Sequence, residues 1–169
     1  MINSDDCFKR LNAKSIFIGK NFTRLLADAE WVCNYGFNNF LIPESLWKLE
    51  PILKKIDYQF PIECCVVLHI PPNTMYNWHN DIERGLSINM KLCNNTTSHT
   101  LFGVSVDSYS DEIIELKYEE DYFYLFNTQN KHCVINFEKD RYMFSVIFKQ
   151  KQELKYTVVY DWCKQNGMY

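Results

Sequence analysis

From residue 62 onward the sequence is a succession of short β-like segments separated by polar turns, and this feature most restricts the fold. The segments are rich in β-branched and aromatic residues, which favour pleated strands. They cover residues 62–70, 75–81, 86–92, 100–106, 112–118, 122–128, 132–137, 141–148 and 155–162. Eight or nine short strands in about 100 residues, with no helix between them, predict a mainly β (α+β) fold of the sandwich or jelly-roll type.

The first 60 residues have a different pattern. Apolar residues recur at helical spacing between Phe22 and Cys33, which predicts an amphipathic helix. A second helical stretch is expected from Pro43, because proline suits a first helical turn, and Pro51 should end or kink it. We therefore expect a helical flank ahead of the β core.

Composition agrees with one globular domain over residues 1–169, made of a helical flank at 1–60 and a jelly-roll core at 62–162. With 47% hydrophobic and 23% charged residues, a chain of this length can bury its own core. Its 18 basic and 21 acidic residues leave a net charge of −3. The chain lacks the basic character typical of duplex-binding proteins, so nucleic acid is not an expected partner.

The cysteines and the N-terminal residues bear on the compartment. There are seven cysteines, an odd number, and no CxxC motif. The N-terminal sequence MINSDDCFKR is charged and lacks the apolar core of a signal peptide. The longest apolar run, Cys64 to Ile70, is too short to cross a bilayer. We expect a reduced, cytoplasmic protein without membrane attachment whose cysteines are mostly buried packing residues. The oligomeric state stays open.

The sequence WHND at residues 78–81 places a histidine and a carboxylate two positions apart. If this stretch is a strand, as predicted, His79 and Asp81 point to the same face. An imidazole beside a carboxylate supplies two of the three ligands of a facial metal triad. The alternative is a His–Asp hydrogen bond on a half-buried strand, since chance produces such a pair in roughly one of four chains of this composition.

A second set of polar residues follows later in the chain. His132 opens an apolar strand after a polar turn, and Arg141 opens the next predicted strand, on the same face as Ser145. A guanidinium buried among the apolar residues of that face needs an anionic partner. A carboxylate-bearing cosubstrate would suit its planar, bidentate fork. The alternative is that Arg141, at the edge of its strand, extends into solvent.

Together these residues resemble the Fe(II)- and 2-oxoglutarate-dependent oxygenases. The shared features are His-X-Asp at the end of a strand, a second histidine some fifty residues later and an arginine about ten residues after it. WHNDIERGLSINMKL resembles the first metal strand of that family, and YLFNTQNKHCVINFEKDRYMFSVIF resembles the second metal strand and the arginine strand. The resemblance covers about residues 62–148 and extends in part to the aspartyl/asparaginyl hydroxylase-like members. It implies a double-stranded β-helix, a jelly roll in agreement with the strand pattern.

The resemblance also implies a catalytic centre. His79, Asp81 and His132 would bind Fe(II) as a facial triad and leave three positions for 2-oxoglutarate and O2. Arg141 would bind the distal carboxylate of 2-oxoglutarate. The metal and cosubstrate would carry the oxidative chemistry, while the protein positions them and excludes water.

Further cosubstrate contacts are less defined by the sequence. The Arg-X-Ser pair of some family branches is absent, and Ser145, four residues after the arginine, could help only if the strand allows it. Tyr76, Asn89 or Lys91 could supply a second hydrogen bond to the cosubstrate. Each of these three could instead be an ordinary solvated strand residue.

The implied activity is that of an oxidoreductase, a 2-oxoglutarate-dependent dioxygenase that hydroxylates an unactivated C–H bond. An amino-acid side chain in a peptide or protein is the favoured substrate, followed by a free small molecule and then a modified nucleic-acid base. Substrate selection would rest on the N-terminal segment and on loops such as 93–99. The alternative from another class is a non-catalytic jelly-roll binding module that holds a small ligand or partner peptide in the same cavity.

The remaining histidines and tryptophans are expected to have mostly structural roles. His99 lies in a polar segment and should be an exposed loop residue. His69 should be a hydrogen-bonded residue at a strand end. Among the tryptophans, only Trp78, next to the expected metal pair, is a candidate pocket residue.

Overall fold

The computed structural model describes residues 3–34, 37–93, 97–105 and 111–169. The strands are β1 (Phe8–Lys14), β2 (Val32–Asn34), β3 (Phe37–Ile42), β4 (Ile62–Ile70), β5 (Thr74–His79), β6 (Ser87–Lys91), β7 (Ser98–Ser105), β8 (Asp111–Leu116), β9 (Tyr122–Phe126), β10 (His132–Asn136) and β11 (Arg141–Phe148). The helices are α1 (Ser4–Cys7), α2 (Ile18–Ala27), α3 (Glu44–Trp47), α4 (Pro51–Gln59) and α5 (Tyr156–Gln165), with a 3-10 turn at Lys151–Glu153. None of the helices in these ranges is long and apolar enough to cross a membrane.

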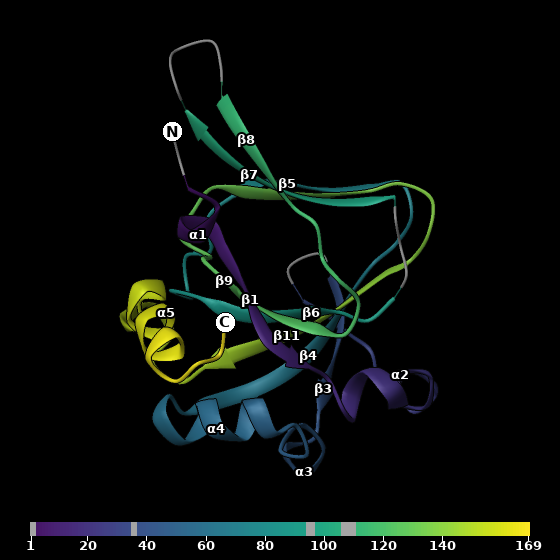
Figure 1. The fold of residues 1–169 in the computed structure, drawn as a ribbon. Helices are drawn as coiled ribbons and strands as arrows, with labels where there is room; N and C mark the ends of the chain where they lie inside the picture. The colour runs from purple at the N-terminus through teal and green to yellow at the C-terminus, as the bar shows by residue number, and fades with distance from the viewer. Residues whose placement is uncertain (1–2, 35–36, 94–96, 106–110) are drawn as a thin grey trace.

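Two antiparallel sheets face each other (Figure 1). Over the described residues, the larger sheet has seven strands in the order β1-β9-β6-β11-β4-β3-β2, and the smaller has four in the order β5-β10-β7-β8. Helices α2, α3 and α4 lie on the outer side of the larger sheet, away from the smaller one (Figure 1). The mainly β class and the double-stranded β-helix expected from the sequence are confirmed.

Eight of the nine expected strands are present, and β4 and β11 begin and end where the sequence predicts. The ninth, over residues 155–162, is wrong, because this segment forms α5. Tyr156, Val159 and Cys163 are buried, and their spacing of three and four residues is that of one helical face. Packing of that face overrode the strand propensity of its aromatic and β-branched residues. Val106 and positions 94–96 of the expected substrate loop lie outside the described residues.

The N-terminal flank is not only helical. The helix expected between Phe22 and Cys33 ends at Ala27, and β2 follows it. Strands β1 and β3 also come from the flank, where they pair with β9 and β4. The helical stretch expected from Pro43 is α3, which ends at Trp47, ahead of Pro51. Pro51 itself begins α4, because the first helical position does not need the N–H that proline lacks.

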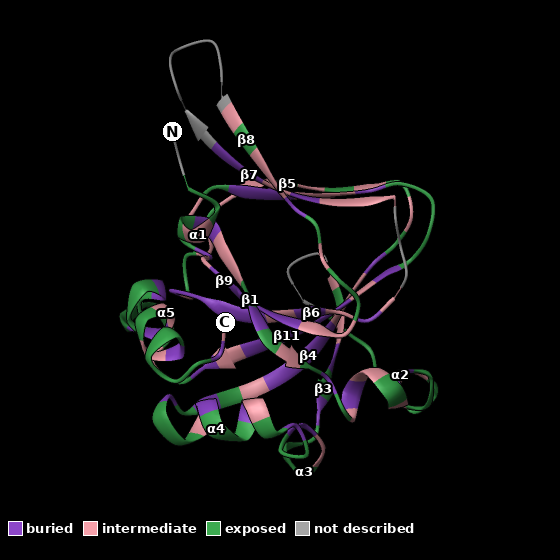
Figure 2. Cartoon of the chain, viewed as in Figure 1, coloured by how far each residue is buried: buried purple, intermediate pink, exposed green. Residues whose placement is uncertain are grey.

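The main hydrophobic core lies between the helices and the outer face of the larger sheet. Phe144 and Val146 of β11 are fully buried there together with Leu53 and Ile56 of α4. Figure 2 shows the opposite, outward sides of α4 and α5 exposed. Since side chains alternate along a strand, the residues of β11 between these core positions face the smaller sheet. The space between the two sheets contains a second, smaller hydrophobic cluster, with Phe102 and Leu116 from the smaller sheet and Tyr124 and Phe126 from the larger one. Polar residues such as Arg141 and Ser145 lie beside it.

A buried carboxylate fixes the start of α2. Glu50 is fully buried and accepts hydrogen bonds from the backbone N–H groups of Ile16, Phe17 and Ile18, at 3.0, 3.0 and 2.7 Å. The Ser15 hydroxyl also donates to it. These N–H groups lie at a helix N-terminus, where they have no partner within the helix and favour a negative charge. Glu50 therefore joins the α3–α4 connection to α2.

The cysteines agree with their expected packing role. All seven are free thiols, and Cys7, Cys65, Cys133 and Cys163 are buried. Burial raises the pKa of the Cys163 thiol to about 11, so this thiol stays protonated at neutral pH. These residues are small apolar components of the core.

Candidate metal and cosubstrate site

Two neighbouring strands of the smaller sheet bring His79 and His132 together. Strands β5 and β10 are antiparallel, and the two histidines are partners in their register. Their ring centroids are 4.2 Å apart. Asp81 lies just beyond the end of β5. The prediction that it belongs to this strand is therefore wrong. Its backbone N–H donates to the carbonyl of Thr128 at 2.9 Å, which holds this loop next to the start of β10.

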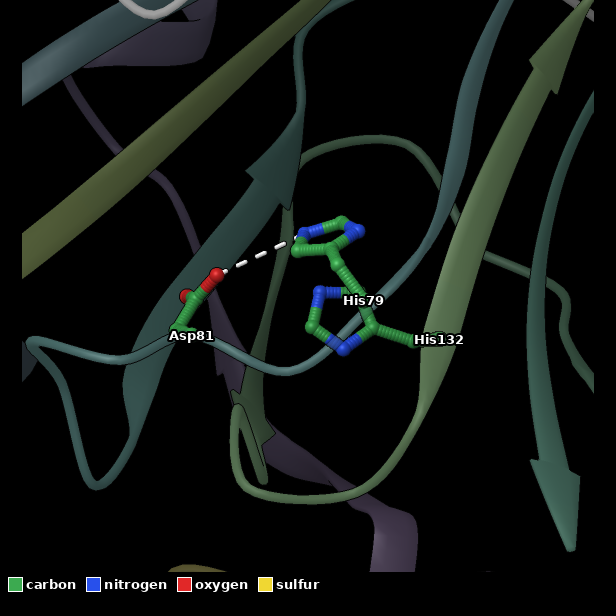
Figure 3. Close-up of side chains that lie close together, drawn as sticks. All are labelled: His79, Asp81 and His132. Carbon is green, nitrogen blue, oxygen red and sulfur yellow. Dashed lines mark ion pairs between the residues drawn. The ribbon is translucent and has the colours of Figure 1, made fainter.

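The three side chains converge between the sheets (Figure 3). One possible ligand atom from each of His79, Asp81 and His132 lies within 4.8 Å of the other two. Nε2 of His79 lies 3.4 Å from Oδ1 of Asp81. His132 is buried, while the other two side chains keep a small exposed fraction. We call this group the triad.

Both histidines are oriented by the same kind of backbone contact. Nδ1 of His79 donates to the carbonyl of Asn77 at 2.7 Å, and Nδ1 of His132 donates to the carbonyl of Asn130 at 2.8 Å. A carbonyl oxygen only accepts, so Nδ1 of each ring carries a proton, and Nε2 is the atom that can bind a metal when the ring is neutral. Two such imidazoles and a carboxylate form the donor set of a facial triad, which fits Fe(II).

The protonation states of His132 and Asp81 also suit metal binding. Burial lowers the pKa of His132 to about 4, so its ring is neutral at neutral pH. Burial acts to lower the pKa of His79, but the hydrogen bonds to Asp81 and to the Asn77 carbonyl outweigh it, and the net shift is upward. Burial acts to raise the pKa of Asp81, but the contact with His79 and the charge of Arg84 lower it overall. The carboxylate is therefore ionised.

Arg141 is buried on the inner face of the larger sheet, with 3% of its surface exposed. Its guanidinium donates to Oγ of Ser98 and to Oγ1 of Thr100, both at 2.7 Å. Its Nε is also buried and has no hydrogen-bond partner, and no carboxylate of the described ranges pairs with the group. Burial lowers the pKa of Arg141. The alternative in which this side chain extends into solvent is wrong.

A cavity of about 100 Å³ between the sheets joins the triad to Arg141. Tyr76, Asn89 and Ser145, three of the candidate cosubstrate residues, line it. Tyr76 also lies edge-on to one triad ring, with 4.3 Å between the centroids. Lys91 is not part of this lining, although it was an equal candidate in the sequence. The cavity therefore holds a triad, a guanidinium and several neutral polar groups.

Arg84 is a site residue that the sequence did not single out. Its Nη2 lies 2.7 Å from Oδ2 of Asp81, and its Nη1 donates to Oγ of Ser145 at 3.5 Å. The signal available in the sequence was its three-residue spacing from Asp81. The backbone of Gly85 passes so close to Leu154 that an added Cβ would lie 2.1 Å from its carbonyl oxygen. This close approach fixes the loop that carries Arg84.

Tyr118 is a second site residue without a signal in the sequence. Its ring centroid lies 5.7 Å from the guanidinium carbon of Arg141, and burial raises its pKa to about 12. Its hydroxyl shares a hydrogen bond with Asn89. Tyr118 follows β8, far along the chain from β11, so only the pairing of distant strands brings it to the site.

Two further histidines and one tryptophan lie elsewhere. Nε2 of His69 is 2.6 Å from Oδ1 of Asp140, which confirms a hydrogen-bonded strand-end role. His99 belongs to β7 and lies 2.7 Å from a carboxylate oxygen of Glu115, so its assignment to an exposed loop is wrong. Trp78 is not part of the cavity lining but packs over Gly103, against the prediction of a pocket role.

Comparison with known proteins identifies the fold through structures and not through sequences. No protein-family model matches this sequence, and no curated protein sequence matches it. An oxidoreductase of the 2OG-Fe(II) oxygenase family from Burkholderia pseudomallei superposes with a TM-score of 0.60 and 9% identity, over 79% of this chain and 81% of that one. A prolyl hydroxylase from Trichoplax adhaerens, in complex with a hypoxia inducible factor peptide fragment, superposes with a TM-score of 0.62 and 13% identity. The superposition covers 85% of this chain and 83% of that one.

A third similar structure contains ligands. HygX from Streptomyces hygroscopicus, with nickel, 2-oxoglutarate and hygromycin B bound, superposes with a TM-score of 0.62 and 10% identity, over 84% of this chain and 82% of that one. At such identities the similarity establishes the fold. The chain has the double-stranded β-helix fold of the 2OG-Fe(II) oxygenase structures, which confirms the resemblance seen in the sequence at the level of fold.

Proposed function

We propose that this protein is an Fe(II)- and 2-oxoglutarate-dependent oxygenase that hydroxylates an unactivated C–H bond of an amino-acid side chain in a peptide or protein. One observation carries the proposal: the triad and a buried guanidinium without a carboxylate partner line the same cavity. The fold similarity supports it, and the similar structures include one with a peptide and one with a small molecule bound.

The residues divide into metal ligands and cosubstrate ligands. His79 and His132 would hold Fe(II) through Nε2, and Asp81 through a carboxylate oxygen. When bound, the metal and 2-oxoglutarate supply the oxidative chemistry, in which O2 is consumed, the cosubstrate is decarboxylated to succinate and the substrate is hydroxylated. Arg141 would bind the distal carboxylate of the cosubstrate and thereby gain the anionic partner that it lacks.

The other polar residues of the cavity would orient the cosubstrate. Ser145 and Asn89 lie on the same inner face as Arg141, on the neighbouring strands β11 and β6, where they are partners in register. Tyr76 approaches from the smaller sheet, next to His79. A buried site between two sheets also keeps bulk water away from the reacting groups, which strengthens electrostatic contacts inside it.

The test is an anaerobic titration of the protein with Fe(II) and then 2-oxoglutarate, followed by the visible charge-transfer band of the complex. We expect a band in the wild type, no band in Asp81→Ala, and a band that needs much more 2-oxoglutarate in Arg141→Ala. Asp161→Ala on the exposed side of α5 and Arg24→Ala on α2 are the matched controls, because both residues are exposed and outside the cavity lining.

The main alternative is a non-catalytic binding module that uses the same cavity for a ligand or peptide. It makes no use of two histidines that are both oriented through Nδ1 and whose possible ligand atoms lie within 4.8 Å of each other and of one on Asp81. If the wild type takes up no metal and shows no band, the oxygenase proposal is rejected and the binding module becomes the better interpretation.

A further inference from the structure

A second and much larger cavity, of about 1100 Å³, opens beside the triad. It extends from the end of α2 across β3 and β4 to the loop that follows β5, and His79 and Asp81 belong to its lining. We call it the groove. Its volume is above the range of roughly 300–1,000 Å³ that is usual for small-molecule pockets. Since it reaches the triad, the proposed reaction would take its substrate from this side.

The groove has an apolar floor that is open to solvent. Leu41 of β3 and Val66 of β4 are partners in register and both line it. Three large apolar side chains of the lining are unusually exposed: Val32 at 54%, Leu41 at 65% and Ile82 at 81%. Exposed apolar side chains gathered in one depression mark a surface that binds another molecule.

One wall of the groove contains a free strand edge. Strand β2 pairs with β3 only from Phe37 to Asn39. Over the next residues, Phe40–Ile42, β3 has β4 on one side, and no strand of the described ranges lies on the other. Unpaired N–H and C=O groups at such an edge can bond to the main chain of an extended peptide. This edge and the size of the groove favour a polypeptide over a small molecule.

The charges of the groove select the kind of polypeptide. Asp28, Glu30, Glu63 and Glu83 all line it and are exposed. None of the four forms an ion pair with any residue that the structure describes. The cationic lining consists of Lys151 and of Arg84, which already contacts Asp81. The free charge around the apolar floor is therefore negative.

We propose that the groove binds an extended polypeptide segment that carries lysine or arginine residues next to the residue to be hydroxylated. The carboxylates come from the end of α2, the start of β4 and the loop after β5, so they are spread along the groove. Such a spread suits several basic side chains of one chain better than a single amine. The inference rests on the proposed function for its reaction, but binding does not require turnover.

The test measures peptide binding by fluorescence anisotropy with the full chain, both metal-free and with Mn(II) and 2-oxoglutarate. Three labelled peptides of equal length share one apolar sequence and differ only in two positions, which are lysine, glutamine or glutamate. We expect the lysine peptide to bind about 5-fold more tightly than the glutamine peptide and the glutamate peptide to bind most weakly, with differences that shrink as salt is added.

Paired variants locate the binding site. Glu63→Gln with Glu83→Gln should weaken binding of the lysine peptide about 5-fold and leave the glutamine peptide unchanged, because only ionic contacts are lost. Glu120→Gln with Glu138→Gln is the matched control, since it removes the same charge from exposed residues outside the groove lining. Leu41→Ser should weaken all three peptides alike. Thermal unfolding of each variant verifies that it is folded.

The outcomes separate this inference from the proposed function. The inference would be overturned if the three peptides bound with equal affinity. It would also be overturned if the groove variant and the control variant lost the same affinity for the lysine peptide, even if Fe(II) and 2-oxoglutarate bind as proposed. If a free lysine amide displaced the labelled peptide as well as the unlabelled lysine peptide does, the groove would not require a polypeptide, because the amide offers the charge without an extended main chain. If the protein bound the lysine peptide selectively but took up no metal, the proposed role of the groove would be supported and the proposed oxygenase function would be rejected.

Discussion

Asp81 is held from two sides, with Arg84 at 2.7 Å from Oδ2 and the Nε2 atom of His79 at 3.4 Å from Oδ1. Arg84 also donates to Ser145 of β11, so it links the loop after β5 to the opposite sheet. Its own backbone carbonyl accepts a hydrogen bond from the Thr128 hydroxyl at 2.6 Å. This arrangement makes Arg84 a positioning residue, which fixes the direction in which the carboxylate presents its second oxygen.

Replacing Arg84 should therefore weaken metal binding. We expect Arg84→Gln to reduce the affinity for Mn(II) about 10-fold, as is typical when the partner of a ligating carboxylate is removed. Arg84→Lys should recover part of the loss, because lysine keeps the charge but lacks the planar fork that reaches two partners. Isothermal titration calorimetry gives the affinities, and Arg24→Gln is the control. Unchanged affinity in Arg84→Gln would mean that the backbone alone positions Asp81.

Arg141 should reduce the stability of the ligand-free protein. A buried guanidinium with no anionic partner is costly, and apolar replacements at such sites are commonly neutral or stabilising. We expect Arg141→Met to raise the free energy of unfolding by about 1 kcal/mol in the absence of cosubstrate. In the Mn(II)-loaded protein, 2-oxoglutarate should stabilise the wild type through linkage and not the variant. Denaturant titrations measure both effects, and a less stable variant would contradict this account.

The stability of the metal-free protein should depend on pH through His132. Its folded-state pKa of about 4 lies below the ordinary value of 6.5, so the unfolded chain binds the proton more readily in this range. Stability is therefore lost as the pH falls from 6.5 toward 4, by about 2 kcal/mol between pH 7 and pH 5. His79 acts in the opposite direction, because its pKa is raised.

The comparison of wild type with His132→Gln isolates this contribution. Denaturant titrations at pH 7 and pH 5 should show a steep loss of stability in the wild type and a much smaller one in the variant. Equal losses in the two proteins would assign the acid sensitivity to other groups.

Glu50 should be one of the more important single residues for stability. Glu50→Gln keeps the size of the side chain but replaces one carboxylate oxygen with an amide NH2, which then faces either the N–H of Ile16 or those of Phe17 and Ile18. We expect a loss of about 2 kcal/mol in the free energy of unfolding, since charge-assisted hydrogen bonds at a helix N-terminus are lost. Glu138→Gln, at an exposed position, should leave the unfolding midpoint unchanged.

Much of the β core could be predicted because its signals are local. Alternation along residues 141–148 placed Arg141 and Ser145 on one face, and the structure finds both on the lining of one cavity. The pair His79 and Asp81 also converges, although Asp81 lies beyond the strand, with its backbone N–H bonded to the carbonyl of Thr128. The two side chains therefore meet as predicted, but they do not do so as alternate residues of one strand.

The failures have a common cause. The segment 155–162 has the composition of a strand, yet it is a helix because Tyr156 and Val159 pack on one face within the core. Strands β1 and β3 are partly polar, and they pair with β9 and β4, which lie further along the chain. Strand β2 has three residues and pairs only with β3. Local propensity is a weak signal where tertiary packing supplies most of the free energy.

The sequence by itself determined the class of fold and the residues that we propose to bind a metal and a dicarboxylate, since periodicity and residue chemistry are properties of short segments. Only the tertiary structure decided how these residues meet: that Arg84 supports Asp81, that Tyr118 lies beside Arg141, and that β3 leaves a free edge in an acidic groove. The physical reason is that such contacts join segments distant in the chain, and their formation depends on the packing free energy of the whole molecule.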